Sequence, residues 1–249
     1  MQEILQKLIT MSNTLGSDAY DCAILGEGNT SAKIDADTFL VKASGTQLGT
    51  IDAAGFVKVR FAPILEALKL ESLSDTDVKD VLLKSTVDNP DQKMPSVETF
   101  LHAILLSHEN VSYVGHTHPT AINSILCSKK AEEAYNGSLF PDQIVVLGTD
   151  PIFVPYTDPG LVLSKLVHQK FTDFLTHFNK APKAIYMQNH GFIAVGATDK
   201  EVLNITQMAV KTARIILGAY AAGGPNFMPD TQVSRIENRP DEHYRRTVI

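Results

Sequence analysis

Hydrophobic and polar residues follow two periods along the chain, and these predict a mixture of helices and strands. Apolar residues recur at helical spacing over residues 2–14, 60–70, 75–84, 96–107, 161–177 and 198–222, and a further helix is expected to begin within 119–126. Alternating or short continuous apolar runs predict strands over residues 23–25, 32–34, 38–43, 111–118, 143–147, 152–154, 184–187 and 192–195. Several of these strands are joined by short turns.

Local signals sharpen some of these boundaries. Pro95 and Ser96 stand where the 96–107 helix should begin, and Thr198 with Glu201 has the spacing of a capping box. Short turns between strands favour a mainly antiparallel sheet with helices packed on it, which makes the fold class α/β. The sequence has no repeat or Pro/Gly/Ser-rich linker, so we expect a single domain over residues 1–249.

Composition and charge narrow the class of protein. The chain is 44% hydrophobic with a net charge of −6 and no long basic run, so a nucleic-acid-binding surface is not expected. It has no signal-like start and no apolar run of about 18 residues, so we expect a cytoplasmic protein that does not enter a membrane. Cys22 and Cys127 form no metal-binding pattern, and we interpret both as reduced packing residues.

Candidate chemistry begins with His116 and His118, an H-x-H pair in an expected strand. Side chains two residues apart in a strand project from the same face, where two imidazoles can chelate a transition metal. By itself the pair is weak evidence for a metal site, and two polar residues at a strand end are then the favoured interpretation. His190 lies in the expected turn between two strands, and three imidazoles with an open position are typical of catalytic zinc.

Acidic and hydroxyl-bearing residues lie near this pattern in sequence. Glu98 falls in the expected first helical turn, where a carboxylate also simply complements the helix dipole. His102 lies four residues further on the same helix face and could support a site or be structural. The segments 28–31 and 44–46 offer glycine and hydroxyl groups that can surround a phosphate, although each reads equally well as an ordinary turn.

Taken together, five segments resemble the class II aldolase/adducin family. They are GEGNTSAKI at 26–34, VKASGTQL at 41–48, PSVETFLHAIL at 95–105, VGHTHPTAI at 114–122 and QNHGFIAVG at 188–196. Their order and gaps match the family pattern. The segments at 41–48 and 95–105 look closest to the aldolase portion of bifunctional rhamnulose-phosphate aldolases, and we expect no dehydrogenase portion in this chain.

The resemblance implies a three-layer α/β/α domain with a zinc ion bound by His116, His118 and His190, although similar sites accept Mn²⁺ or Co²⁺. It implies that Glu98 is the catalytic acid/base and a metal ligand before substrate arrives. It implies a homotetramer with active sites between subunits. Family members often use a tyrosine from a neighbouring subunit, and Tyr244 is the candidate here by position.

The same resemblance implies a small-molecule substrate, a sugar or sugar phosphate. The residues expected to bind its phosphate are Gly28, Asn29, Ser44, Gly45 and Ser96. One departure is Val97, which stands where related fuculose-phosphate aldolases have a second serine. The loss of that hydroxyl removes one donor to phosphate.

The expected reaction is retro-aldol cleavage of a ketose 1-phosphate to dihydroxyacetone phosphate and an aldehyde. A sugar-phosphate 4-epimerase and a 3-oxo-acid phosphate decarboxylase use related chemistry, but epimerases of the family usually carry aspartate at the position of Glu98. A non-enzymatic adducin-like interaction domain would lack the metal histidines. A purely structural zinc site would usually have four protein ligands, often cysteines.

Overall fold

The fold is described from a computed structural model, which covers residues 1–242 and Tyr244. The main helices are α1 (Gln2–Leu15), α2 (Phe61–Ala67), α3 (Asp75–Ser85), α4 (Thr99–Leu106), α5 (Thr120–Leu126), α6 (Ala131–Ala134), α7 (Pro141–Leu147), α8 (Leu161–Phe178), α9 (Asp199–Ala221) and α10 (Asp230–Glu237). The strands are β1 (Asn29–Lys33), β2 (Thr38–Lys42), β3 (Phe56–Arg60), β4 (Thr86–Val87), β5 (Tyr113–Thr117), β6 (Ile152–Val154), β7 (Ala184–Met187) and β8 (Gly191–Gly196). Short 3₁₀ turns, η1 (Leu48–Thr50) and η2 (Ala53–Gly55), precede β3.

The described strands form one sheet in the order β4-β3-β2-β1-β5-β8-β7-β6. Every neighbouring pair is antiparallel except β6 and β7, which run parallel. In the centre of the sheet, Asn29 of β1 pairs with His116 of β5, and Thr117 of β5 pairs with Phe192 of β8. This register brings three of the segments that carry candidate chemistry to the same place.

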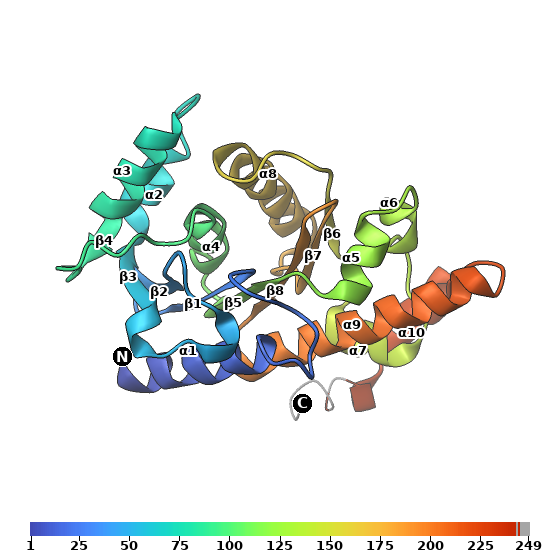
Figure 1. Ribbon diagram of the computed structural model, residues 1–249. Coiled ribbons are helices and arrows are strands. Elements are labelled where there is room, and N and C mark those ends of the chain that lie inside the picture. The colour runs from blue at the N-terminus through green and yellow to red at the C-terminus, as the bar shows by residue number, and fades with distance from the viewer. Residues whose placement is uncertain (243, 245–249) are drawn as a thin grey trace.

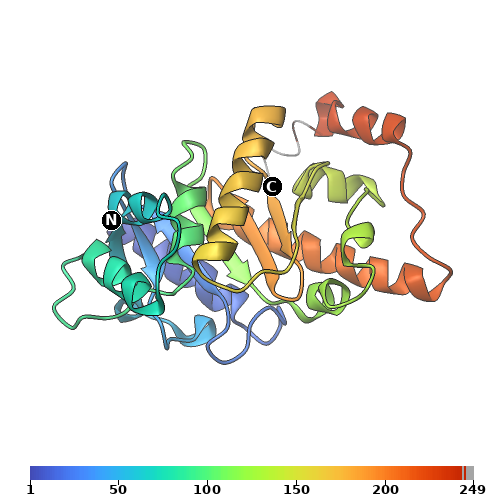
Figure 2. The same cartoon turned by 90° about the horizontal axis from the view of Figure 1, so that it is seen from above.

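Helices cover both faces of the sheet, which confirms the expected α/β class with a mainly antiparallel sheet (Figure 1). On one face α2, α3, α4 and α8 pack against the sheet (Figure 2). Strand residues alternate between the faces as a pleated strand requires. On β8, for example, Ile193 and Val195 face α4 and α8, whereas Phe192 and Ala194 face the opposite layer.

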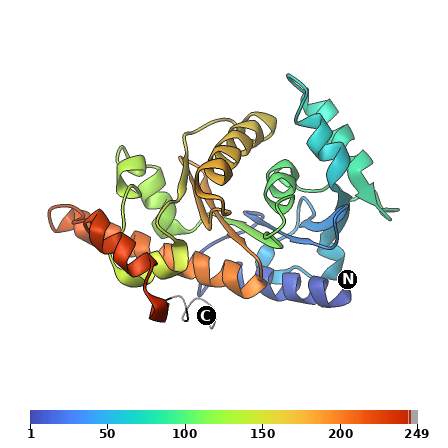
Figure 3. The same cartoon turned by 180° about the vertical axis from the view of Figure 1, so that it is seen from behind.

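The opposite face is covered by α1, α5, α7 and α9, and Figures 1 and 3 show α1 and α9 running along it. Helix α9 begins at the Thr198 cap, whose hydroxyl accepts a hydrogen bond from the Glu201 amide. Gly223 and Gly224 follow its last turn with positive φ. The predicted start and stop of this helix are therefore confirmed.

Two sequence predictions of strands are wrong. Residues 143–147 form most of α7, which has Pro141 at its first turn and ends at Gly148 with φ 78°. A short apolar run is compatible with a buried strand or a buried helix. Here the run forms a helix, in which residues 144–147 are all buried. Residues 23–25 form an exposed loop in which the Glu27 carboxylate accepts a hydrogen bond from the Ile24 amide at 3.1 Å.

Some elements begin at other residues than predicted, and some were not predicted at all. The expected 96–107 helix begins only at Thr99, because Ser96 to Glu98 form a turn before it. Asn29, Thr30 and Ser31, expected in a turn, lie in β1. Strands β3 and β4 and helices α6 and α10 were not predicted. Two of these, β4 and α6, are too short for a clear period, whereas β3 carries Phe56, Val57 and Val59 and was overlooked.

The two cysteines behave differently. Both thiols are free, and Cys22 is buried as expected of a packing residue. Cys127 is exposed, so the expectation that it packs in the interior is wrong: it follows the last turn of α5 on the solvent side. Among residues 1–242 and Tyr244, we find no helix with the length and apolar character needed to cross a bilayer.

Candidate metal centre and active site

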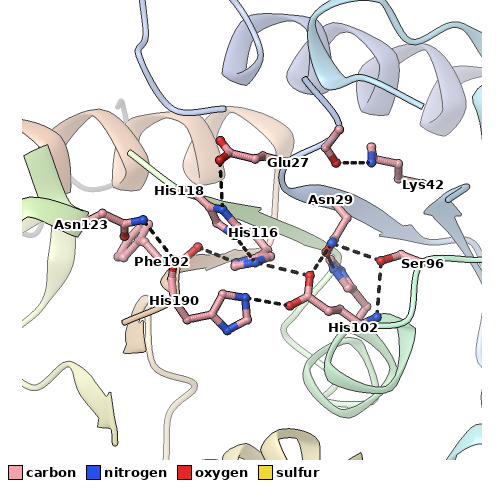
Figure 4. Close-up of polar contacts among 12 residues, drawn as sticks. Glu27, Asn29, Lys42, Ser96, His102, His116, His118, Asn123, His190 and Phe192 are labelled. Carbon is pink, nitrogen blue, oxygen red and sulfur yellow. Dashed lines mark hydrogen bonds and ion pairs between the residues drawn. The ribbon is translucent and has the colours of Figure 1, made fainter. Parts of the chain in front are cut away.

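Three histidine rings meet where β5 ends beside the β7–β8 turn (Figure 4). His116 lies in β5, His118 directly follows it, and His190 lies in the turn that precedes β8. Their ring centroids are 4.8 to 5.4 Å apart, and one nitrogen from each lies within 4.8 Å of the others. Because β5 and β8 are paired neighbours, the sheet register itself holds the three rings together.

The hydrogen bonds of the rings decide which nitrogens face one another. Nδ1 of His116 donates to the carbonyl of Phe192 at 3.1 Å, which leaves Nε2 with a lone pair. Nε2 of His118 lies 3.0 Å from that nitrogen, while its Nδ1 faces the Glu27 carboxylate at 3.8 Å. The main-chain carbonyl of His190 accepts a hydrogen bond from Asn123 at 3.0 Å, which anchors the turn.

Burial favours the neutral form of two of these rings. It lowers the pKa of His116 to about 4, although the Glu98 carboxylate opposes the shift. Burial and the neighbouring imidazoles likewise lower the pKa of His118 to about 4. At neutral pH both rings therefore carry the lone pairs that a metal ion requires.

Glu98 is the acidic member of the group. Its Oε2 accepts a hydrogen bond from Asn29 Nδ2 at 2.6 Å and lies 3.4 Å from Nε2 of His116. Its Oε1 is buried and lies 3.1 Å from Nε2 of His190, with no other hydrogen-bond partner among the described residues. Burial alone would raise the pKa of this carboxyl, but His116, His190 and the Asn29 amide outweigh it and hold the pKa well below its usual range.

These side chains fit a divalent metal ion. Imidazole nitrogens and carboxylates are ligand types that transition metals take, and here three imidazoles and the Glu98 carboxylate converge. The Nε2 atoms of His116 and His118 lie 3.0 Å apart and both Glu98 oxygens lie within 3.4 Å of a histidine nitrogen, so a cation would find imidazole nitrogens and a carboxylate close together. The donor set alone does not choose among zinc, manganese and cobalt.

The predicted phosphate-binding residues fall into two sets. Asn29 and Ser96 are buried beside Glu98, and Asn29 Nδ2 also lies 3.2 Å from Ser96 Oγ. The loop that carries Ser44 and Gly45 is more exposed. It is joined to the 94–96 segment by hydrogen bonds from the Ser44 amide to the Met94 carbonyl and from the Ser96 amide to the Lys42 carbonyl. The structure thus brings both segments to one side of Glu98.

Gly28 is required by a close approach of two segments. It has φ 67°, and a Cβ built on it would lie 2.6 Å from the carbonyl oxygen of His116. Only glycine combines this conformation with such contact. The turn before β1 therefore passes directly over the part of β5 that carries His116.

Two further charged residues near the site were missed by sequence reasoning. Glu27 faces the outer nitrogen of His118 (Figure 4). Lys42 is buried at the end of β2, where its ammonium donates to the Gly26 carbonyl at 3.2 Å and burial lowers its pKa. A lysine ending the otherwise apolar run 39–41 is the signal that could have revealed it. Tyr244 is 69% exposed, and its expected role stays a prediction.

Comparison with known proteins identifies the family. The family described as Class II Aldolase and Adducin N-terminal domain matches residues 6–217. A Bacillus subtilis (strain 168) protein named "Uncharacterized oxidoreductase YuxG" is 30% identical over 238 residues, which cover 90% of this chain but 32% of that protein. The chain therefore spans about a third of that relative, whose activity as a whole does not transfer.

Solved structures agree on the fold. The N-terminal class II aldolase domain of a conserved protein from Thermoplasma acidophilum is 34% identical, with a TM-score of 0.66 over 86% of this chain and 93% of that one. A structure named L-fuculose 1-phosphate aldolase has a TM-score of 0.71, 17% identity and 95% coverage of both chains. YgbL from Escherichia coli, a putative aldolase/epimerase/decarboxylase, has a TM-score of 0.68, 18% identity and coverage of 95% and 99%. With the fold and the family match in agreement, this chain belongs to the class II aldolase and adducin family.

Proposed function

We propose that this chain catalyses the reversible cleavage of a ketose 1-phosphate to dihydroxyacetone phosphate and an aldehyde, with zinc bound by His116, His118 and His190. The observation that carries the proposal is the Glu98 carboxylate. It is ionised and buried, with Asn29 donating to one oxygen, while the other oxygen faces the imidazoles and lies 3.1 Å from Nε2 of His190. A non-enzymatic interaction domain would have no use for such a costly arrangement.

Cleavage breaks the bond between C3 and C4 of the ketose. The C4 hydroxyl loses its proton as the aldehyde forms, and the electron pair of the broken bond stays on the three-carbon fragment as an enediolate. When bound, zinc supplies a Lewis acid that stabilises the negative charge developing on the oxygens of that fragment. Protonation of C3 then yields dihydroxyacetone phosphate, so protons balance without a further reactant.

Glu98 is proposed as the group that carries the proton to and from C3. Oε2 is occupied by the Asn29 amide, so Oε1 is the oxygen available for the transfer. Tyr244 is proposed to take the proton of the C4 hydroxyl in a homotetramer, where it would come from a neighbouring subunit. A site between subunits would also exclude water from the enediolate.

The phosphate is proposed to lie against the turn at Gly28 and Asn29, the loop at Ser44 and Gly45, and Ser96. Main-chain amides and hydroxyl groups in such turns are suitable donors to a phosphate. Val97 beside Ser96 is 49% exposed and has no side-chain hydrogen-bond donor. The hydroxyl and amide groups of the other segments must therefore supply more of the hydrogen bonds to the phosphate.

The test pairs metal content with product release. We expect about one zinc ion per purified wild-type chain, its loss in His116→Ala, and release of dihydroxyacetone phosphate from a panel of ketose 1-phosphates. His168→Ala, on the exposed side of α8, is the matched control and should retain both. Metal binding with epimerisation or decarboxylation in place of cleavage would replace the aldolase proposal by one of those reactions. A protein without metal or activity after zinc addition would favour the adducin-like interaction domain.

A further inference from the structure

A network of buried, hydrogen-bonded side chains lies beneath Glu98, on the side away from the three histidines of the candidate metal site. It joins Ser31 and Asn29, which share one face of β1, to His102 on α4. Ser31 is fully buried, His102 is 1% exposed and Asn29 is 4% exposed. The metal site and the proposed proton transfer use Glu98, and nothing so far explains why a histidine is buried behind it.

In this side-chain network, only one assignment of hydrogen-bond donors and acceptors is consistent. The ionised Glu98 carboxylate can only accept, so the group of Asn29 that lies 2.6 Å from it must be the amide nitrogen. The amide oxygen of Asn29 then faces Nε2 of His102, and an oxygen in that position can only accept. Nε2 of His102 must therefore carry the proton, and Nδ1 must accept a hydrogen bond from the Ser31 hydroxyl at 2.6 Å.

The orientation of the Asn29 amide matters because its two ends are nearly the same size but opposite in polarity. A flipped amide would turn its oxygen towards Oε2 of Glu98 and place two acceptors against each other. Burial leaves no water to relieve that contact. His102 opposes the flip, because its Nε2–H would then face the two protons of the amide nitrogen.

We propose that His102 is a positioning residue, which fixes the Asn29 amide so that it always donates to Oε2 of Glu98 and leaves Oε1 free. Ser31 selects the ring form of His102 that can do this. The influence acts through Asn29, since His102 itself does not face the three metal-binding histidines (Figure 4). The consequence for turnover rests on the proposed function, whereas the hydrogen-bond pattern does not.

The first test is spectroscopic and needs no substrate. In ¹⁵N-labelled wild-type protein, we expect the His102 resonances of a neutral ring with the proton on Nε2, and we expect the Nε2 proton to be protected from exchange. Ser31→Ala should weaken this preference, because it removes the donor to Nδ1. A wild-type ring with its proton on Nδ1 would overturn the proposal, whatever reaction the protein catalyses.

The second test uses two variants of nearly the same polarity. His102→Gln places an amide nitrogen near the position of Nε2 and keeps a donor to Asn29, whereas His102→Asn is too short to reach it. We expect His102→Asn to lower kcat about 10- to 100-fold with KM little changed, as for other residues that orient a metal-site group. His102→Gln should retain most of the wild-type kcat. The control is His168→Gln, at a position on the exposed side of α8.

The outcomes separate the two proposals. Equal kcat values for His102→Asn and wild type would overturn the positioning role, and so would equal losses in His102→Gln and His102→Asn with both variants folded by thermal melting. If the wild-type protein cleaves no ketose phosphate, the proposed function fails, but the ring form of His102 still decides the hydrogen-bond pattern. The amide resonances of Asn29 in His102→Asn and His102→Gln give the same comparison without activity.

Discussion

Replacement of Gly191 by alanine is the sharpest perturbation of the metal site that leaves all of its ligands in place. A Cβ at this position would lie 2.6 Å from Cδ2 of the His118 ring, 2.7 Å from the carbonyl oxygen of Thr117 and 3.0 Å from Cε1 of the His116 ring. Gly191 does not have a positive φ, so the backbone accepts alanine and the whole effect is steric. The added methyl group therefore acts directly on two of the three proposed ligands.

The size of the effect follows from these distances. Ordinary contacts between non-bonded carbon atoms are about 3.5 to 4.0 Å, so the His118 ring or the backbone must move by about 1 Å. Thr117 is paired with Phe192 in the sheet, so the rings are the softer neighbours. Overpacking of this kind costs about 1–3 kcal/mol of folding free energy. A misplacement of about 1 Å in a site can reduce its function about 100-fold.

The assay is zinc affinity by competition with a chromogenic chelator, paired with urea unfolding of the metal-free protein. We expect Gly191→Ala to bind zinc about 100-fold more weakly while the metal-free protein loses about 1–3 kcal/mol. Gly218→Ala is the control, because Gly218 lies on the exposed side of α9 and a Cβ there meets nothing within 4 Å. It should leave zinc affinity unchanged and stabilise the helix by about 0.5–1 kcal/mol. Wild-type zinc affinity in Gly191→Ala would refute the reasoning.

Three further predictions follow from the site and its surroundings. Glu98→Gln should retain zinc on the three histidines but lower kcat for ketose phosphate cleavage by about 100-fold or more, and unchanged turnover would exclude Glu98 as the proton carrier. Removal of bound metal with EDTA should abolish cleavage and lower the thermal midpoint, both restored by zinc, since the metal binds the folded state; an unchanged midpoint would argue against a metal in this site. In native protein, Ellman's reagent should modify exposed Cys127 but not Cys22, because burial raises the pKa of Cys22 to about 12; equal rates would contradict the buried position of Cys22.

The helices with strong periodicity and caps could be predicted well. The long helix after Thr198 has a threonine cap at its start, whose hydroxyl accepts a hydrogen bond from the Glu201 amide, and glycines at its end, and both signals act locally. The run 143–147 failed because five apolar residues fit a buried strand and a buried helix equally, and only the packing of α7 against α9 decides between them. Helix α4 begins at Thr99 and not at Ser96 as predicted. The Ser96 carbonyl accepts a hydrogen bond from the Thr99 amide and so forms a turn that the residue pattern does not reveal.

The candidate site also has features that the sequence could predict and features that it could not. The sequence alone determined the candidate metal ligands, because H-x-H in one strand and a histidine in the turn between two later strands are visible as residue types, and the family resemblance links them. Three features came only with the tertiary structure: the pairing of Asn29 with His116, the burial that keeps His116 and His118 neutral, and the hydrogen bonds that lead from Ser31 through His102 and Asn29 to Glu98. Spacing fixes which side chains share one strand or helix, since those contacts are local. Which segments lie side by side depends on sheet register and packing, which are settled over the whole chain at once.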